Sequence, residues 1–168
     1  MCPGIQLVKA RPSIYVEKHH ELLRSVDQIV QVEKVYSIDE WSVQLRGPQR
    51  EPAAARQLAE EVKRQVLKDF GPWLSCSIGV APTRLLAKIA SELDKPDGLT
   101  ILTEADIALR VWPLAVRKIN GIGPKAGARL QALDITTVGQ LAACPRDWLL
   151  AQFGRRYGRW LHDASHGV

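Results

Sequence analysis

The chain has 168 residues, of which 46% are hydrophobic and 24% charged, and this composition excludes a protein dominated by disorder. Lys and Arg number 23 against 18 Asp and Glu, so the net charge of +5 favours an anionic partner. The three scattered cysteines exclude a disulfide framework, and no apolar run approaches the ~18 residues of a membrane span, so we expect a cytoplasmic protein with no membrane partner.

The first hundred residues predict helices alternating with strands. Apolar residues at helical spacing and segments of alternating polarity give the following order. Helices are predicted at 14–29, 53–70 and 84–93, and strands at 30–37, 41–45, 74–81 and 99–102. This order predicts an α+β fold, with an antiparallel or mixed sheet and helices on one face.

Beyond Thr103 the character of the sequence changes. No strand-like stretch follows, and Gly, Pro, Lys and Arg interrupt short helical segments. We therefore expect a domain boundary between residues 103 and 113, with one domain at 1–103 and a small helical domain at 104–168.

Two adjacent carboxylates, Asp39 and Glu40, lie in an apolar segment that is rich in strand-forming residues. A half-buried carboxylate costs free energy unless it is paired or bound to a cation. A divalent metal site is one explanation for this pair, and a solvated edge of the sheet is the other.

The segment from Ile119 to Leu130 contains an apolar-Gly-apolar-Gly turn that opens a helix. Gly121 and Gly123 allow a tight turn, and the free N–H groups at the start of the next helix can bind a phosphate. Lys125 and Arg129 lie one helical turn apart and would add positive charge beside it. The segment is similar to a helix-hairpin-helix, which holds DNA by its backbone, although a glycine-rich packing corner has the same pattern.

Two further basic groups have both a structural and a functional interpretation. Lys88 and Lys95 lie on and after the third predicted helix, where they are either surface lysines or phosphate ligands. Arg155, Arg156 and Arg159 either cover a solvated helix face or contact phosphates.

Five motifs, in order and at family-like spacing, resemble the Y-family (DinB/UmuC-like) translesion DNA polymerases. They are Tyr36-Ser-Ile-Asp-Glu40, Ser77-Ile-Gly-Val-Ala-Pro82, Leu86-Ala-Lys-Ile-Ala-Ser91, Lys95-Pro-Asp-Gly98 and Gly121-Ile-Gly123. The resemblance covers nearly the whole chain. It implies a partial palm subdomain at 1–103 and a helix-hairpin-helix thumb at 104–168.

The resemblance also implies roles for individual residues. Asp39 and Glu40 match the paired carboxylates that help to hold two Mg²⁺ ions for nucleotidyl transfer. Lys95 matches a lysine that reaches the incoming deoxynucleoside triphosphate. Gly121 and Gly123 match the hairpin that grips primer-template DNA. A bacterial SOS-response enzyme of the cytoplasm, associated with the nucleoid and served by a sliding clamp, is the expected context.

The departures from the family pattern lead to one further expectation. The strand with the other metal-binding Asp, the fingers and the little finger have no counterpart in the 168 residues, so we expect a piece of a polymerase that is inactive alone. A non-catalytic DNA-binding accessory protein, or pseudo-polymerase, is the alternative. A helix-hairpin-helix module beside an unrelated α+β domain is a third interpretation.

Overall fold

The computed structural model describes residues 4–6 and 8–168, and the chain folds as two compact units. Met1–Leu74 form the first unit and Ser75–Val168 the second.

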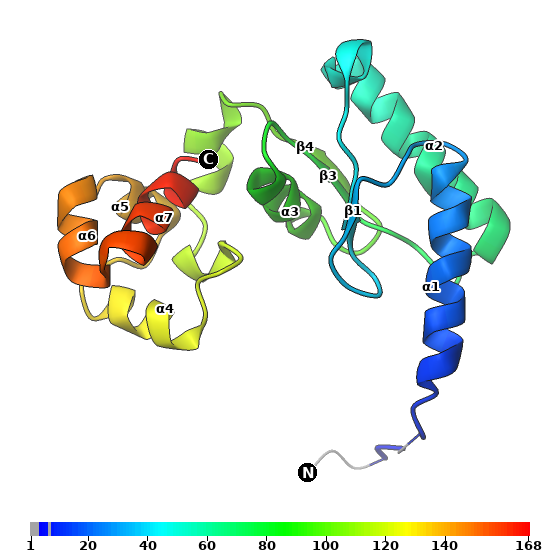
Figure 1. The fold of residues 1–168 in the computed structure, drawn as a ribbon, viewed down its shortest axis with the longest axis horizontal. Coiled ribbons are helices and arrows are strands. Elements are labelled where there is room, and N and C mark those ends of the chain that lie inside the picture. The colour runs from blue at the N-terminus through cyan, green and yellow to red at the C-terminus, as the bar shows by residue number, and fades with distance from the viewer. Residues whose placement is uncertain (1–3, 7) are drawn as a thin grey trace. The chain divides into compact units, whose positions relative to one another are not determined.

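Two long helices and a short hairpin make up the first unit (Figure 1). Its elements are α1 (Pro12–Asp27), β1 (Lys34–Val35), β2 (Trp41–Ser42), the 3₁₀ turn η1 (Gly47–Arg50) and α2 (Pro52–Phe70). The two predicted helices are confirmed, and a proline in the first turn of each is compatible with a helix start because that N–H has no intrahelical partner. β1 and β2 pair antiparallel but have only two residues each, so the strands are shorter than the sequence pattern predicts.

The core of the first unit lies along one stripe of α2, which packs against α1. Ala55, Ala59, Val62 and Val66 recur at helical spacing and are buried, as is Val26 of α1. A polar link joins the ends of the same two helices. Ser25 donates its hydroxyl proton to Asp69 Oδ2 at 2.7 Å, and Gln65 Nε2 donates to the same oxygen at 2.9 Å. The Ser25 hydrogen bond holds the pKa of Asp69 below its ordinary value, because it stabilises the charged carboxylate.

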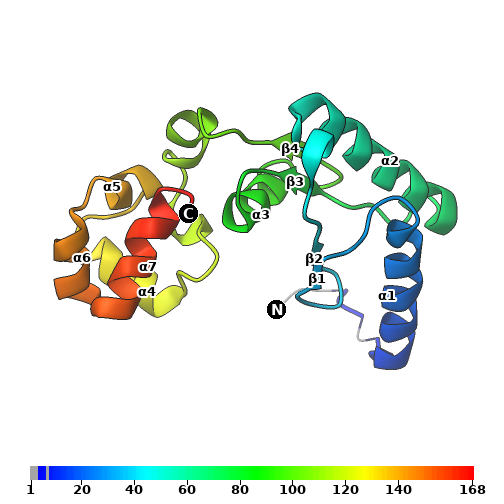
Figure 2. The ribbon, with the colours of Figure 1, turned by 45° about the horizontal axis from the view of Figure 1, so that its top comes forward.

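The second unit begins with a strand-helix-strand segment and continues as a set of short helices (Figure 2). Its elements are β3 (Ile78–Val80), α3 (Arg84–Leu93), β4 (Leu99–Ile101), the π-helical turn η2 (Ile107–Val111), the 3₁₀ turn η3 (Val116–Lys118), α4 (Pro124–Gln131), α5 (Val138–Ala142), α6 (Arg146–Phe153) and α7 (Arg155–Ser165). β3 and β4 pair parallel, so the described strands form two separate two-stranded sheets. The predicted α+β class with a helical C-terminal part is confirmed.

One hydrophobic core unites the segments of the second unit. It includes Leu86 and Ile89 of α3, together with Ile119, Leu130 and Leu161 from the helical part. Polar contacts reinforce this union. Thr83 caps α3 by accepting a hydrogen bond from the Leu86 N–H at 3.4 Å and donates its own proton to the carbonyl of Gly167 at 2.7 Å.

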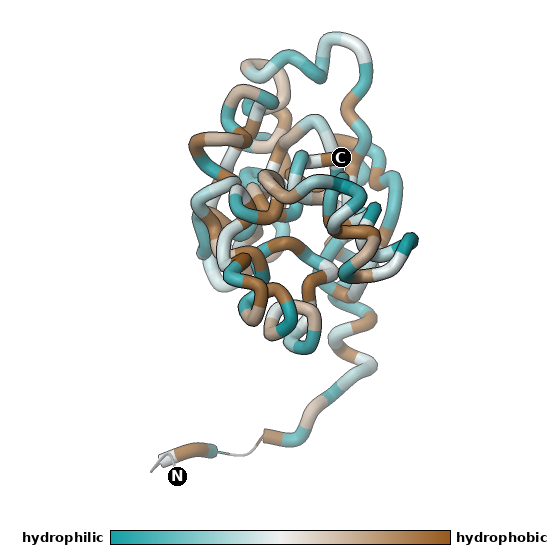
Figure 3. Tube along the Cα trace, turned by 90° about the vertical axis from the view of Figure 1, so that its left-hand side faces the viewer, coloured by the Kyte–Doolittle hydropathy of each residue, from teal (hydrophilic) through white to brown (hydrophobic). Residues whose placement is uncertain are grey.

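Polar and apolar residues alternate along the helices of the trace in Figure 3. Within the residues that the structure describes, every helix is either too short or too polar to cross a bilayer. Neither Cys76 nor Cys144 forms a disulfide, and Cys2 lies outside the described residues. The boundary predicted at residue 103 differs from the division at Leu74 between the compact units, and it stays a prediction about subdomains.

Candidate nucleic-acid interface and carboxylate pair

Asp39 and Glu40 lie in the loop that joins β1 to β2. The backbone N–H groups of Tyr36 and Ser37 both donate to the Glu40 carbonyl, at 2.8 and 3.2 Å, and these bonds close the loop. The Ser37 hydroxyl donates to Asp39 Oδ1 at 2.6 Å, which fixes the carboxylate of an exposed residue, while Glu40 is half-buried. The loop therefore holds two carboxylates that are adjacent in sequence, and neither is completely buried.

The donor chemistry of this pair fits Mg²⁺. Mg²⁺ prefers oxygen ligands and keeps several waters, so in polymerase-type sites one or two carboxylates and the substrate phosphates complete its coordination. The structure has no group of three or more His, Cys, Asp or Glu side chains that could hold a metal, as far as its described residues extend. Asp39 and Glu40 can thus supply two oxygen ligands of such a site.

Lys95 lies directly after α3, in the second unit. Its Nζ is 2.8 Å from Glu92 Oε1, and Lys88 Nζ is 2.9 Å from the same oxygen. These hydrogen bonds, that of Lys95 above all, hold the pKa of Glu92 below its ordinary value. Two of the cations singled out from the sequence are therefore gathered around one carboxylate, and about half of the Lys95 side chain, 52%, stays exposed.

The two glycines of the predicted hairpin have different structural roles. Gly121 has φ +113°, and a Cβ atom placed there would lie 2.6 Å from the Trp160 ring. Gly123 is the N-cap of α4 with φ −74°, and a Cβ atom there would meet nothing within 4 Å. The fold thus requires glycine at 121, whereas a side chain at 123 would enter open space at the start of α4.

The two basic residues of α4 also have different surroundings. Lys125 is exposed in the first turn of α4, beside the free N–H groups. Arg129 donates from Nη2 to the Gln152 carbonyl, and its guanidinium lies 4.9 Å from the centre of the Phe153 ring. Arg129 therefore connects α4 to the end of α6. The sequence did not indicate this packing role, because the partners of Arg129 lie on another helix.

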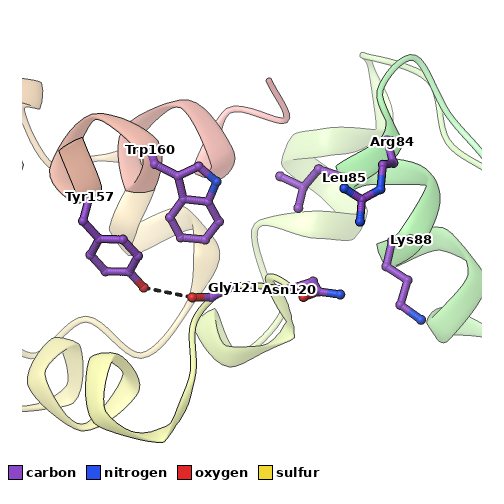
Figure 4. Close-up of a pocket in the computed structure, with 7 residues that line it drawn as sticks. All are labelled: Arg84, Leu85, Lys88, Asn120, Gly121, Tyr157 and Trp160. Atoms are coloured by element: carbon purple, nitrogen blue, oxygen red, sulfur yellow. Dashed lines mark hydrogen bonds between the residues drawn. The ribbon is translucent and has the colours of Figure 1, made fainter. Parts of the chain in front are cut away.

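A cleft of about 380 Å³ lies beside Gly121 (Figure 4). Its lining residues are Arg84, Leu85, Lys88, Asn120, Gly121, Tyr157 and Trp160. Two cations come from α3 and two stacked aromatic rings from α7, with 5.2 Å between the ring centres of Tyr157 and Trp160. The described residues that line the cleft carry two cations and no carboxylate, and one of these cations, Lys88, is paired with Glu92.

Tyr157 and Trp160 are among the lining residues that sequence reasoning missed. The Tyr157 hydroxyl donates to the Gly121 carbonyl at 3.0 Å, and burial raises the pKa of this hydroxyl, so it stays protonated at neutral pH. Their spacing of three residues, flanked by the buried Gly158 and Leu161, is the helical pattern that could have indicated an inward face.

Comparison with known families gives two matches along the chain. The sequence model of the impB/mucB/samB family matches residues 1–92, and that of the helix-hairpin-helix motif of DNA polymerase eta and Rev1 matches residues 114–168. The first match covers more than half of the chain. The chain belongs to the impB/mucB/samB family.

The matches between this chain and curated relatives extend over its whole length. The chain is 36% identical over 168 residues to DNA polymerase IV of Moorella thermoacetica and 31% identical over 168 residues to DNA polymerase IV of Shewanella sp. strain ANA-3. The match covers all of this chain but 41% of the first relative and 46% of the second. The chain thus spans less than half the length of these relatives.

Solved structures with the same fold are Y-family DNA polymerases. A TM-score of 0.82 at 22% identity relates the chain both to DinB from Sulfolobus solfataricus and to an insertion ternary complex of Dbh DNA polymerase. Each comparison covers 98% of this chain and 48% of the other. The fold predicted from the five motifs is thereby confirmed.

Proposed function

We propose that this chain supplies part of the palm and the thumb for template-directed nucleotidyl transfer by a DNA polymerase that copies damaged DNA. The observation that carries the proposal is the presence, in one chain of the impB/mucB/samB family, of an accessible carboxylate pair at Asp39 and Glu40 and of a glycine turn that opens α4. The relatives named DNA polymerase IV support the same function.

The proposed DNA grip acts through the backbone of the hairpin. The open space at Gly123 lets a phosphate approach the free N–H groups of α4, and Lys125 adds a positive charge beside them. The cleft next to Gly121 offers further cationic groups from Arg84 and Lys88. Because these groups recognise phosphate and not base edges, we expect binding that depends little on sequence.

The proposed chemistry uses the carboxylate pair and Lys95. Asp39 and Glu40 would hold Mg²⁺, which supplies activation of the primer hydroxyl and stabilisation of the leaving pyrophosphate. Ser37 orients Asp39 through its 2.6 Å hydrogen bond. Lys95 would exchange its partner Glu92 for an oxygen of the incoming deoxynucleoside triphosphate, because both offer negatively charged oxygen.

Several finer parts of the proposal rest on the family. They are Mg²⁺ as the ion, primer-template DNA and a deoxynucleoside triphosphate as substrates, a sliding clamp as protein partner, expression in the SOS response, and work at the nucleoid in the cytoplasm. Two related solved structures support the substrates, since they are ternary complexes of Dbh.

A binding experiment tests the grip. Anisotropy of a fluorescent primer-template is measured with the purified 168-residue chain at a series of salt concentrations. Phosphate contacts predict that the logarithm of affinity falls linearly with the logarithm of salt, by about 0.9 per contact. An affinity that does not change with salt would show that the hairpin does not hold the backbone.

A titration experiment tests the carboxylate pair. We expect the chain to take up Mg²⁺ weakly, and more strongly when a deoxynucleoside triphosphate is present, because the phosphates complete the coordination. The double variant Asp39→Asn/Glu40→Gln should lose this uptake. The double variant Glu104→Gln/Asp134→Asn is the matched control, since it removes the same charge from exposed residues of the second unit. Equal uptake by both double variants would place the ion elsewhere.

The pseudo-polymerase is the competing function. Both functions predict DNA binding, and both predict background levels of primer extension by the 168 residues alone. Only the polymerase predicts nucleotide-dependent uptake of Mg²⁺ through Asp39 and Glu40. Strong primer extension by the isolated chain would contradict the proposed metal site, because ligands beyond this pair would then be present.

A further inference from the structure

We propose that α7 carries a second surface for the nucleic-acid backbone, formed by Arg155, Arg156 and Arg159. These residues surround a shallow hollow of about 360 Å³, and all three are exposed. The inference rests on the proposed function, because it adds a second contact to the DNA grip of the hairpin.

The position of these arginines is unfavourable for the stability of the helix. Arg155 and Arg156 lie in the first turn of α7, where the helix dipole repels cations, and the turn has neither an acidic residue nor a side-chain cap. Arg159 lies one turn further and faces both at the spacing that brings like charges together. A bound anion would relieve this repulsion.

No neighbouring carboxylate relieves it within the part of the chain that the structure describes. None of the ion pairs found there includes Arg155, Arg156 or Arg159, and the first acidic residue of α7 is Asp163. Three guanidinium groups with planar donors match the oxygens of phosphates. The chemistry of the surface therefore fits a polyanion.

The other face of α7 fixes this surface relative to the hairpin. Tyr157 lies between the arginines in sequence but points to Gly121, to which its hydroxyl is bonded at 3.0 Å (Figure 4). Trp160 stacks on Tyr157 and fills the space beside Gly121. Because one short helix carries both faces, the arginines keep a fixed position relative to the hairpin.

The binding surface and a structural role for the arginines predict opposite changes in stability. The triple variant Arg155→Ala/Arg156→Ala/Arg159→Ala removes repulsion at the helix start, so its melting temperature should equal or exceed that of the unchanged chain. Its affinity for a short fluorescent DNA duplex should fall, by roughly tenfold to a hundredfold at about 0.1 M salt, and the salt slope should fall by roughly 2 to 3.

A charge-matched control separates local contact from net charge. The triple variant Arg50→Ala/Arg56→Ala/Arg64→Ala removes three exposed arginines from the first unit. Equal losses of affinity and slope in the two triple variants would overturn the proposal, and so would a marked drop in melting temperature for the α7 variant. If the α7 variant retains the salt slope of the unchanged chain, the proposed grip of the hairpin is supported and the proposed second surface is refuted. If the unchanged chain shows no salt-dependent binding, the proposed DNA grip itself fails.

Discussion

Alanine at each of the two hairpin glycines should separate the stability of the fold from its affinity for DNA. At 121 the residue needs a φ of +113°, and its Cβ would lie 2.6 Å from Trp160. A residue with a side chain at such a φ costs about 1 to 3 kcal/mol, and overpacking against a ring costs a further 1 to 3 kcal/mol or so. At 123 neither cost arises, because φ is −74° and the space is open.

The expected magnitudes are large enough to measure. Gly121→Ala should lower the free energy of unfolding of the second unit by roughly 2 to 6 kcal/mol, which for a unit of this size lowers the melting temperature by roughly 10 to 30 °C. Gly123→Ala should change the free energy of unfolding by less than about 1 kcal/mol, since loss of the small N-cap residue opposes the lower entropy of the unfolded chain. Its Cβ instead obstructs the approach of a phosphate to α4.

Calorimetry and duplex anisotropy on both variants provide the assay. The expected pattern is a destabilised Gly121→Ala variant, and a stable Gly123→Ala variant with weaker DNA binding. Equal melting temperatures for the two variants would refute the assignment of strain to Gly121. A stable Gly123→Ala variant with unchanged affinity would refute phosphate approach at that position.

Three further predictions concern the pKa of a carboxylate and the stability of the fold. Ser25→Ala removes the main cause of the lowered pKa of Asp69, so NMR titration should show this pKa closer to its ordinary value, and an unchanged pKa would contradict the link. The pKa of Glu92 is lower in the folded chain than in the unfolded chain. The hydrogen bonds of Glu92 therefore stabilise the fold fully at a pH above the ordinary pKa of Glu, and this stabilisation is lost as the pH falls through the lowered pKa. Glu92→Gln should therefore cost less than about 1 kcal/mol at pH 7 in urea unfolding and should flatten the acid side of the stability curve, whereas an unchanged curve would exclude the contribution of Lys95. Leu130→Ala, at a fully buried position, should lower the free energy of unfolding by about 2 to 5 kcal/mol, and a smaller loss would mean that the core closes around the cavity.

Much of the fold was predictable because its signals are local. The helix at 84–93 is bounded by Pro82-Thr83 and by Lys95-Pro96, and the structure gives it the same limits. The strands were harder to predict. Alternation in 30–45 predicts two longer strands, but the hydrogen bonds that close the loop at Tyr36 and Ser37 confine the paired residues of each strand to two.

The candidate site was predictable only in part, for a related reason. The glycine spacing indicates a tight turn, but the requirement for glycine at 121 comes from Trp160, which lies 39 residues further along the chain. The contact of Arg129 with Phe153 is likewise tertiary. Sequence periodicity shows which face of a helix turns inward and gives no information about what that face meets.

The hydrogen bond from Thr83 to Gly167 has a consequence for the order of folding. It joins residues separated by 84 positions, and the segment between them includes every helix from α3 to α7. Closing so long a loop costs entropy before the packing of those helices offsets it, so we predict that this contact forms late in folding. The same hydroxyl also caps α3. The Thr83 side chain therefore joins a local contact at the start of α3 to a distant contact after α7, and only the distant contact depends on the packing of the second unit.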